Sequence, residues 1–273
     1  MSGNENSNVL TIKTVQIAPF RTLMTALKDI LLETNIIFSE DGIRIVNMDK
    51  SHTILAHLYL PSKNFEVYEM RDGIKKIVIG VNMFHLFKLI NSIDNDDTLT
   101  IYIEDGDWNS GVPNFLGLKF ENGDIKQCKT QKLRLIEPDP EELEVPDVAF
   151  SSIINLPSTD FQKIIRDLSS ISDKLEIKSV GNELIFHCKG PYASAEIRRE
   201  ESDGNMDFVQ KQESTKIIQG EFSLKNLGYF IKCTNLCNSI EMYLENNLPL
   251  VVKYNVASLG EIRLCLAPLP SSG

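Results

Sequence analysis

The sequence lacks any long apolar run, and this absence excludes the first class of protein. No segment approaches the ~18 consecutive apolar residues that span a bilayer, so we expect no transmembrane helix. No basic stretch followed by an apolar one opens the chain, so no secretory signal is expected. The 5 cysteines are odd in number and include no Cys-x-x-Cys pair, which favours reduced intracellular thiols over a disulfide framework.

Signatures of catalysis and of cofactor binding are also scarce. No GxxxxGK[ST] phosphate loop is present, so ATP hydrolysis is not expected. Cys233 and Cys237 are four positions apart but lack the further ligands of a zinc site, which favours core packing. The acidic runs near Asp94 and Asp105 lack the glycine and glutamate spacing of a calcium loop. We therefore expect no catalytic residues, no metal, no cofactor and no enzymatic activity.

An excess of positive charge is missing as well. The chain has 28 Lys and Arg against 38 Asp and Glu, a formal net charge of -10, which excludes a uniformly basic nucleic-acid binder. Its 273 residues are 42% hydrophobic, which is ordinary for a globular protein and suggests about two domains.

Short β-branched and aromatic runs bounded by turn residues dominate the chain and predict antiparallel strands. Amphipathic spacing predicts only four helices, three of them preceded by a residue that can cap free amides: Asn82, Ser158 and Ser223. The predicted helices cover residues 18–32, 82–91, 158–170 and 223–233.

The helices occur in a repeated order, which indicates a duplicated unit. Lys28-Asp29 in the first helix recurs as Arg166-Asp167 in the third, and Leu86 recurs as Leu227 at nearly the same offset. A proline-rich acidic stretch lies between the halves and predicts an extended connector. We expect a flexible N-terminal extension at 1–8, domains at 9–134 and 148–268, a connector at 135–147 and a short tail at 269–273.

Positive charge is concentrated on these four helices despite the acidic total. In three of the helices the spacing keeps two cations on one side, and a single basic surface made of helices would attract phosphates without reading bases. Charge alone leaves open the alternative that these cations only solvate exposed helix faces. The candidate DNA-facing residues are Arg21, Lys28, Lys88, Lys163, Arg166, Lys225 and Lys232.

Particular strings then resemble those of a known family. They are Gly42-Ile43-Arg44-Ile45-Val46-Asn47-Met48-Asp49-Lys50-Ser51-His52, Leu156-Pro157-Ser158-Thr159-Asp160-Phe161, Ile165-Arg166-Asp167-Leu168-Ser169, Pro249-Leu250-Val251-Val252-Lys253-Tyr254 and Leu266-Ala267-Pro268. In register from about residue 10 to 268, the chain is similar to the proliferating cell nuclear antigen (PCNA) family of DNA sliding clamps. The resemblance implies an α+β DNA-clamp fold: two similar domains, each with two helices packed on antiparallel sheets, assembling into a closed ring.

The resemblance also implies partners. A ring of three subunits would encircle double-stranded DNA without sequence specificity and hold DNA polymerase, a clamp loader and other proteins that carry a glutamine-aliphatic-diaromatic motif. No membrane partner is expected. By position, the partner-peptide groove falls on Met48, His52, Thr53, Leu55, Leu143, Val145, Pro249, Cys265, Ala267 and Pro268. Leu143 and Val145 could instead pin the connector, and His52 could be structural; Cys265 replaces a usual aromatic, which predicts an altered partner preference.

In the family, subunits join by antiparallel strand pairing, which here would set residues 126–134 against 192–198 of the next subunit. The implied interface residues are Lys126, Lys129, Gln131, Leu133, Tyr192, Ser194, Glu196 and Ile197. A homotrimer is expected, with heteromeric pairing left open.

The sequence therefore predicts a DNA sliding clamp, a processivity factor for replication and repair. One alternative is a subunit of a heterotrimeric checkpoint-type clamp. Another is a duplicated β-rich adaptor or hydrolase that does not act on DNA. The expected location is the nucleus for a cellular protein, or a cytoplasmic replication factory for a large DNA virus.

Overall fold

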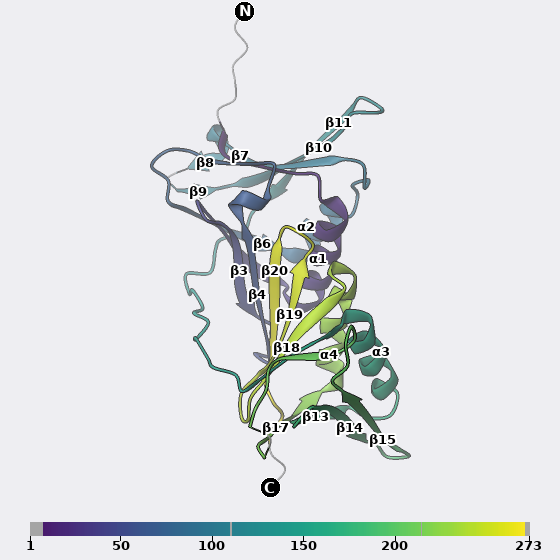
Figure 1. Ribbon diagram of the computed structural model, residues 1–273. Coiled ribbons are helices and arrows are strands. Elements are labelled where there is room, and N and C mark those ends of the chain that lie inside the picture. The colour runs from purple at the N-terminus through teal and green to yellow at the C-terminus, as the bar shows by residue number, and fades with distance from the viewer. Residues whose placement is uncertain (1–7, 110, 214, 271–273) are drawn as a thin grey trace, which may run out of the picture. The chain divides into compact units, whose positions relative to one another are not determined.

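The computed structural model describes residues 8–109, 111–213 and 215–270, and divides the chain into two compact units (Figure 1). The first unit holds the residues up to Asn47, His57–Glu144 and Val256–Glu261; the second holds Met48–Ala56, Val145–Asn255 and the residues from Ile262 onward. Asn8, expected in the N-terminal extension, instead begins a strand. The rest of that extension lies outside the described residues, as do positions 271–273 of the predicted tail.

The first unit contains a five-stranded sheet and a second group of strands. The sheet has the order β11-β10-β7-β1-β5, and the second group has the order β4-β3-β2-β6. Their bounds are β1 Asn8–Thr14, β2 Glu33–Ser39, β3 Gly42–Met48, β4 Ile54–Pro61, β5 Val67–Met70, β6 Lys76–Asn82, β7 Thr98–Glu104, β10 Phe115–Asn122 and β11 Gln127–Arg134. Two short 3-10 turns, η1 Ser62–Asn64 and η2 Asp105–Asp107, and a small hairpin, β8 Trp108–Asn109 with β9 Val112–Pro113, complete the unit.

The second unit repeats this arrangement. A four-stranded sheet has the order β15-β14-β13-β17, and a second group has the order β16-β12-β18-β19-β20. The bounds are β12 Ser152–Pro157, β13 Lys174–Val180, β14 Glu183–Lys189, β15 Ser194–Glu200, β16 Asp207–Gln210, β17 Ile217–Ser223, β18 Ser239–Leu244, β19 Leu250–Val256 and β20 Gly260–Leu266. The strand registers in both units are antiparallel, which confirms the predicted α+β class.

Each unit contributes two α-helices, α1 Ile17–Ile30 and α2 Met83–Ile90 in the first, α3 Ser158–Ser169 and α4 Leu224–Phe230 in the second. Each buries one apolar side because its hydrophobic residues recur with the helical period. Asn82 and Ser223 are N-caps, as predicted: their side chains accept from the amides of His85 at 3.1 Å and Asn226 at 3.3 Å. All four predicted helices are therefore confirmed, with small shifts at their ends.

Two details of the helix prediction were wrong. Ser158 does not cap α3; it is the first helical residue, and its hydroxyl donates to the Cys237 carbonyl at 2.6 Å. The fourth helix does not continue to residue 233 as an α-helix, because the chain tightens into a 3-10 helix, η3 Ile231–Leu236, which contains Lys232.

The first part of the connector is held along β6. The Ile136 amide donates to the Gly80 carbonyl at 3.0 Å. The Asn35 side chain, on neighbouring β2, donates to the Asp139 carbonyl at 2.7 Å and accepts from the Asp139 amide at 2.9 Å. A Cβ on Gly80 would lie 2.7 Å from the Ile136 carbonyl oxygen, so glycine is required for this close approach.

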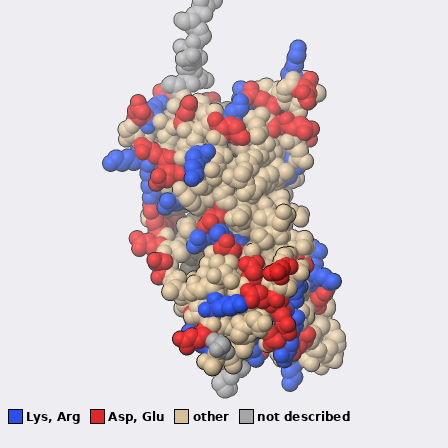
Figure 2. Space-filling model, viewed as in Figure 1, with Lys and Arg blue, Asp and Glu red and all other residues tan. Residues whose placement is uncertain are grey.

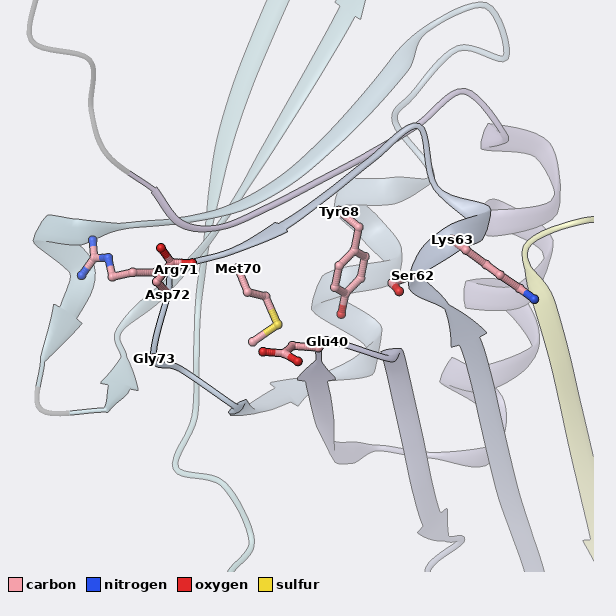
Figure 3. Close-up of a pocket in the computed structure, with 8 residues that line it drawn as sticks. All are labelled: Glu40, Ser62, Lys63, Tyr68, Met70, Arg71, Asp72 and Gly73. Atoms are coloured by element: carbon pink, nitrogen blue, oxygen red, sulfur yellow. The ribbon is translucent and has the colours of Figure 1, made fainter.

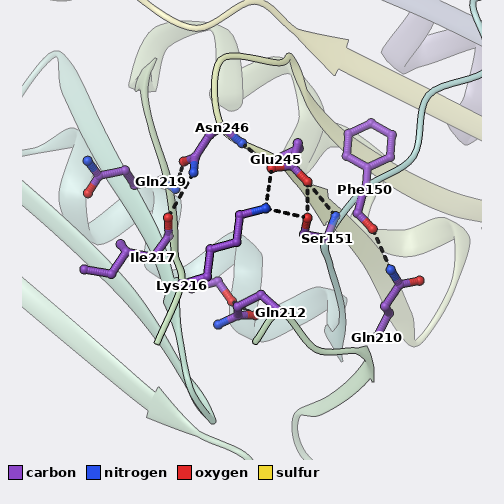
Figure 4. Close-up of polar contacts among 10 residues, drawn as sticks. Phe150, Ser151, Gln210, Gln212, Lys216, Ile217, Gln219, Glu245 and Asn246 are labelled. Carbon is purple, nitrogen blue, oxygen red and sulfur yellow. Dashed lines mark hydrogen bonds and ion pairs between the residues drawn. The ribbon is translucent and has the colours of Figure 1, made fainter. Parts of the chain in front are cut away.

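In the second unit, a polar cluster holds the segment that enters β12. The Glu245 carboxylate accepts from the Ser151 amide at 2.8 Å, and Lys216 donates to the Ser151 hydroxyl at 3.0 Å (Figure 4). Asn246 accepts from the Gln219 amide at 2.8 Å, which adds the beginning of β17 to the cluster. Burial acts to raise the pKa of Glu245, but hydrogen bonds from Ser151 and from the Asn246 amide outweigh it and lower that pKa. The ionised carboxylate therefore joins the end of β18 to β12 and β17.

Candidate functional site

The first unit brings three predicted DNA-facing cations together on α1 and α2; Lys88 is exposed, whereas Arg21 and Lys28 are half-buried. The Arg21 guanidinium donates to the Asn95 side chain at 3.1 Å and to the Ile93 carbonyl, in the loop after α2. The Lys28 side chain is 18% exposed and pairs with Asp29 at 2.8 Å. Arg21 and Lys28 therefore form polar contacts within their own unit. Their spacing in the sequence does not predict these contacts.

The second unit carries the other four predicted cations, and all four are exposed: Lys163, Arg166, Lys225 and Lys232. The first two lie on α3, Lys225 lies on α4 and Lys232 on η3. The apolar residues of α3 between them, Ile164 and Ile165, are buried. The four cations consequently project from the solvent side of packed helices, where phosphates could reach them.

Elsewhere the surface is not of one sign. Figure 2 shows Lys and Arg interspersed with Asp and Glu over the visible face of both units. Oppositely charged side chains also form ion pairs within each unit, such as Arg199 with Asp160 at 2.9 Å and Lys132 with Glu104 at 2.7 Å. A local cationic surface is therefore compatible with the net charge of -10.

Sequence reasoning missed the aromatic rings beside three of the cations. Lys88 lies over the Phe84 ring at 4.6 Å, Lys28 over Phe87 at 4.8 Å, and Lys232 lies 5.5 Å from the Tyr229 ring. The available signal was Phe84, an aromatic residue outside the apolar stripe of its helix.

Four of the predicted groove residues lie in the second unit, between the end of β3 and the start of β4: Met48, His52, Thr53 and Leu55. Asp49 organises this loop, because its Oδ1 atom accepts from the amides of Thr53 at 2.8 Å and Ile54 at 2.7 Å. His52 is exposed and has a φ of 55°, in the left-handed region that non-glycine residues rarely occupy. The loop thus holds His52 outward at the cost of an unfavourable backbone conformation.

The C-terminal residues of the predicted groove lie against the same loop. The Ala267 amide donates to the Thr53 carbonyl at 2.9 Å, and the Asn226 side chain donates to the Thr53 hydroxyl at 3.2 Å. Cys265 is half-buried, and burial raises the pKa of its thiol to about 11, so it stays protonated at neutral pH. Thr53 is therefore contacted both by the C-terminal segment and by α4.

The remaining groove candidates differ in exposure and in the unit to which they belong. Pro249 is exposed and Pro268 is half-buried in the second unit, and Val145 is 42% exposed. Leu143 is 37% exposed and is counted with the first unit.

Both predicted assembly strands are edge strands of their sheets: β11 in the first unit and β15 in the second. In an antiparallel pair, every second residue hydrogen-bonds to the neighbouring strand. The Leu135 amide donates to the Asn114 carbonyl, so on β11 the amides of Thr130 and Lys132, at odd steps from Leu135, face away from β10. On β15, the bond from the Gly190 amide to the Ala193 carbonyl likewise leaves Glu196 facing away from β14. Each edge therefore offers a row of free backbone donors and acceptors.

The side chains predicted for this interface differ in exposure. Lys126, Tyr192, Ser194 and Glu196 are exposed, and Lys129, Gln131 and Ile197 are half-buried. Leu133 is 6% exposed and packs inside its own unit. Lys129 donates to the Ser92 hydroxyl at 3.0 Å, and Glu196 pairs with Arg198 at 2.7 Å. Lys129 and Glu196 thus already have partners in the chain, so backbone pairing is the stronger part of the predicted contact.

One further hollow, of about 380 Å³, lies in the first unit near β5. Figure 3 shows Glu40 and Met70 at its centre, with Lys63 and Arg71 directed away from it. Arg71 pairs with Asp105 at 2.6 Å, and the Tyr68 hydroxyl donates to the Ser39 carbonyl at 2.8 Å. Arg71 is thus paired within the unit, and the hollow contains no predicted site residue.

Among the described residues, no group of three or more His, Cys, Asp or Glu side chains is placed to hold a metal ion. In the same part of the chain, no helix is both long and apolar enough to cross a membrane.

Comparison with known proteins agrees with this architecture. The family model "Proliferating cell nuclear antigen, N-terminal domain" matches residues 9–142, and "Proliferating cell nuclear antigen, C-terminal domain" matches residues 144–269. A relative named "Probable DNA polymerase sliding clamp 1", from Paramecium bursaria Chlorella virus 1, is 32% identical over 98% of this chain and 100% of its own length. A "Proliferating cell nuclear antigen" from Chaetomium thermophilum is 28% identical over 95% of this chain and 98% of its own length.

The duplicated units and these matches define the class: the protein is a sliding clamp. The chain belongs to the proliferating cell nuclear antigen family. Neither alternative drawn from the sequence, a checkpoint-type clamp subunit or an adaptor that does not act on DNA, gains support from these matches.

Proposed function

We propose that this sliding clamp is a non-enzymatic homotrimeric ring that encircles duplex DNA and tethers a DNA polymerase and other replication and repair proteins. The observation that carries the proposal is the pair of open edge strands, β11 on the first unit and β15 on the second. Because the two edges differ, their pairing is head-to-tail, and such contacts form rings when the rotation between subunits closes.

The helices supply the second part of the proposal. Their exposed cations, Lys88, Lys163, Arg166, Lys225 and Lys232, would attract phosphates without contacting base edges. Such contacts are weak and screened by salt, which suits sliding, because a ring is retained by its closure and not by tight binding. We therefore expect DNA association without sequence preference.

Partner proteins would bind the surface around Thr53, where the loop at 48–55, Pro249 and the segment at 265–268 lie in one unit. Loop and C-terminal segment are joined there by the Ala267–Thr53 hydrogen bond. A surface built from these residues suits a short peptide with a glutamine and with aliphatic and aromatic anchors. We infer that the protein acts where DNA is replicated, in a nucleus or in a viral replication factory.

Retention on DNA of different topology tests the encircling ring. We expect the protein, once loaded, to stay on nicked circular DNA and to leave the same DNA after linearisation, while its solution mass corresponds to three chains. Equal retention on both templates, or a monomeric mass at working concentration, would overturn the proposal.

A charge-reversal variant tests the helical surface separately. Replacing Lys88, Arg166 and Lys225 by Glu should abolish most polymerase stimulation and leave the solution mass unchanged. A matched variant with Lys63, Lys75 and Lys211 replaced by Glu makes the same change in net charge away from these helices and should retain stimulation. Equal loss in both variants would contradict the assignment of the helices.

A further inference from the structure

The exposed side of α2 carries two phenylalanines, although the solvent side of a surface helix is normally polar. Phe84 is 44% exposed and Phe87 is half-buried. Their rings have centroids 6.5 Å apart and planes inclined by 27°, so they form a nearly parallel pair one helical turn apart. Part of the Phe84 ring is therefore available to a flat ligand.

Two lysines flank this ring pair and give it positive charge. The Lys88 ammonium lies 4.6 Å from the Phe84 centroid, and the Lys28 ammonium lies 4.8 Å from that of Phe87. Lys28 is partly neutralised by Asp29, whereas Lys88 is exposed. The site thus combines an aromatic face with a cation that can reach a phosphate on the same ligand.

This combination has one natural ligand class. Proteins bind single-stranded nucleic acid by stacking bases on aromatic side chains beside cations that contact the backbone. Bases inside a duplex are already stacked on each other and cannot reach the face of a protein ring unless they are flipped out or lie at an end. Charge complementarity therefore favours a nucleic acid, and the aromatic face favours an unpaired one.

We propose that Phe84, with Phe87 and Lys88, is a stacking site for unpaired bases of single-stranded DNA, such as those beside a primer end. The inference rests on the proposed function, because it assumes that α2 faces DNA. By the offset that pairs Leu86 with Leu227, the position equivalent to Phe84 in the second unit is Lys225, which has no aromatic ring. The stacking site is thus a property of the first unit.

The test measures binding of the full-length protein to a labelled oligothymidylate of ~20 nucleotides that contains one 2-aminopurine, whose fluorescence is quenched by stacking. Phe84→Ser should weaken binding about tenfold and remove the quenching, since one base–aromatic stack contributes ~1–3 kcal/mol. Phe84→Tyr, which keeps the aromatic face, should retain both. Lys88→Gln should weaken binding and reduce its salt dependence by about one phosphate contact, whereas Phe84→Ser should leave that dependence unchanged.

Controls separate this site from the clamp function. Val112→Ser removes a similarly exposed apolar side chain of the same unit and should leave oligonucleotide binding unchanged. Phe84→Ser should still be retained on circular duplex DNA. Unchanged oligonucleotide binding by Phe84→Ser, or an altered solution mass of that variant, would overturn the stacking site while leaving the clamp function intact. Failure of the unmodified protein to distinguish circular from linear DNA would instead overturn the clamp proposal.

Discussion

The Oδ1 atom of Asp49 accepts a hydrogen bond from the Ile54 amide at 2.7 Å and thereby closes the loop that carries His52 and Thr53. The same oxygen accepts from the Thr53 amide at 2.8 Å, and the second oxygen accepts from the Ser51 amide at 3.2 Å. Asp49 itself need not touch a partner to matter. It fixes the backbone of the residues that are proposed to do so.

Replacing Asp49 by Ala should therefore weaken partner binding without removing a contact residue. The loop amides would lose their acceptor, and a left-handed His52 would no longer be held, so the loop should adopt other conformations. We expect affinity for a peptide with the glutamine-aliphatic-diaromatic motif to fall about tenfold, equivalent to the ~1–3 kcal/mol of an unsatisfied polar group. Fluorescence anisotropy with labelled peptide measures this effect. Asp49→Asn, which keeps an acceptor oxygen, should lose less, and equal affinities for all three proteins would contradict the role of the loop.

The pH dependence of stability offers an independent test of the same carboxylate. Burial acts to raise the pKa of Asp49, but hydrogen bonds from Ser51 and from the amides of Ile54 and Thr53 together lower it. A folded-state pKa below the unfolded value of ~3.9 stabilises the protein above that pH, and the contribution is lost as the pH falls through the folded pKa. Urea unfolding of the unmodified protein and of Asp49→Asn should therefore show a difference in unfolding free energy that is constant near neutral pH and shrinks below ~4. A difference that does not depend on pH would show that Asp49 is not the titrating group.

Arg21 and Lys88 should respond differently to truncation, although the sequence gives them the same role. Arg21→Ala removes the donor to the Ile93 carbonyl and to Asn95, so we expect a loss of ~1–3 kcal/mol in unfolding free energy. Lys88→Ala removes an exposed cation and should change stability by less than ~0.5 kcal/mol, while DNA association becomes weaker and less sensitive to salt. Thermal denaturation and salt-dependent DNA binding separate the two effects. A stable Arg21→Ala variant with a large loss of DNA binding would show that Arg21 acts mainly on DNA.

These contrasts indicate how far the sequence could predict the molecule. The helices and their order follow from periodicity and from caps such as Asn82, which are local properties of the chain. The engagement of Arg21 depends on a loop more than seventy positions away, and the ring pair at Phe84 depends on which side of α2 is left uncovered. Likewise, the tightening at Ile231 that ends α4 has no clear signal in its apolar spacing. Long-range contacts and exposure, which local patterns do not encode, account for what was missed.

A proline at Glu196 should open the proposed ring while leaving the chain folded. The Glu196 amide faces away from β14, so its loss breaks no bond inside the sheet, and an edge strand tolerates proline at such a position. In the proposed ring, however, this edge of β15 faces a neighbouring subunit. The same change there removes a backbone donor and places a pyrrolidine ring against the partner strand. We expect Glu196→Pro to have the mass of a single chain by light scattering and to lose retention on circular DNA. Glu196→Ala, which keeps the amide, should remain trimeric, because the Glu196 side chain already pairs with Arg198 at 2.7 Å in its own strand. A trimeric proline variant would show that the subunits do not assemble through this edge.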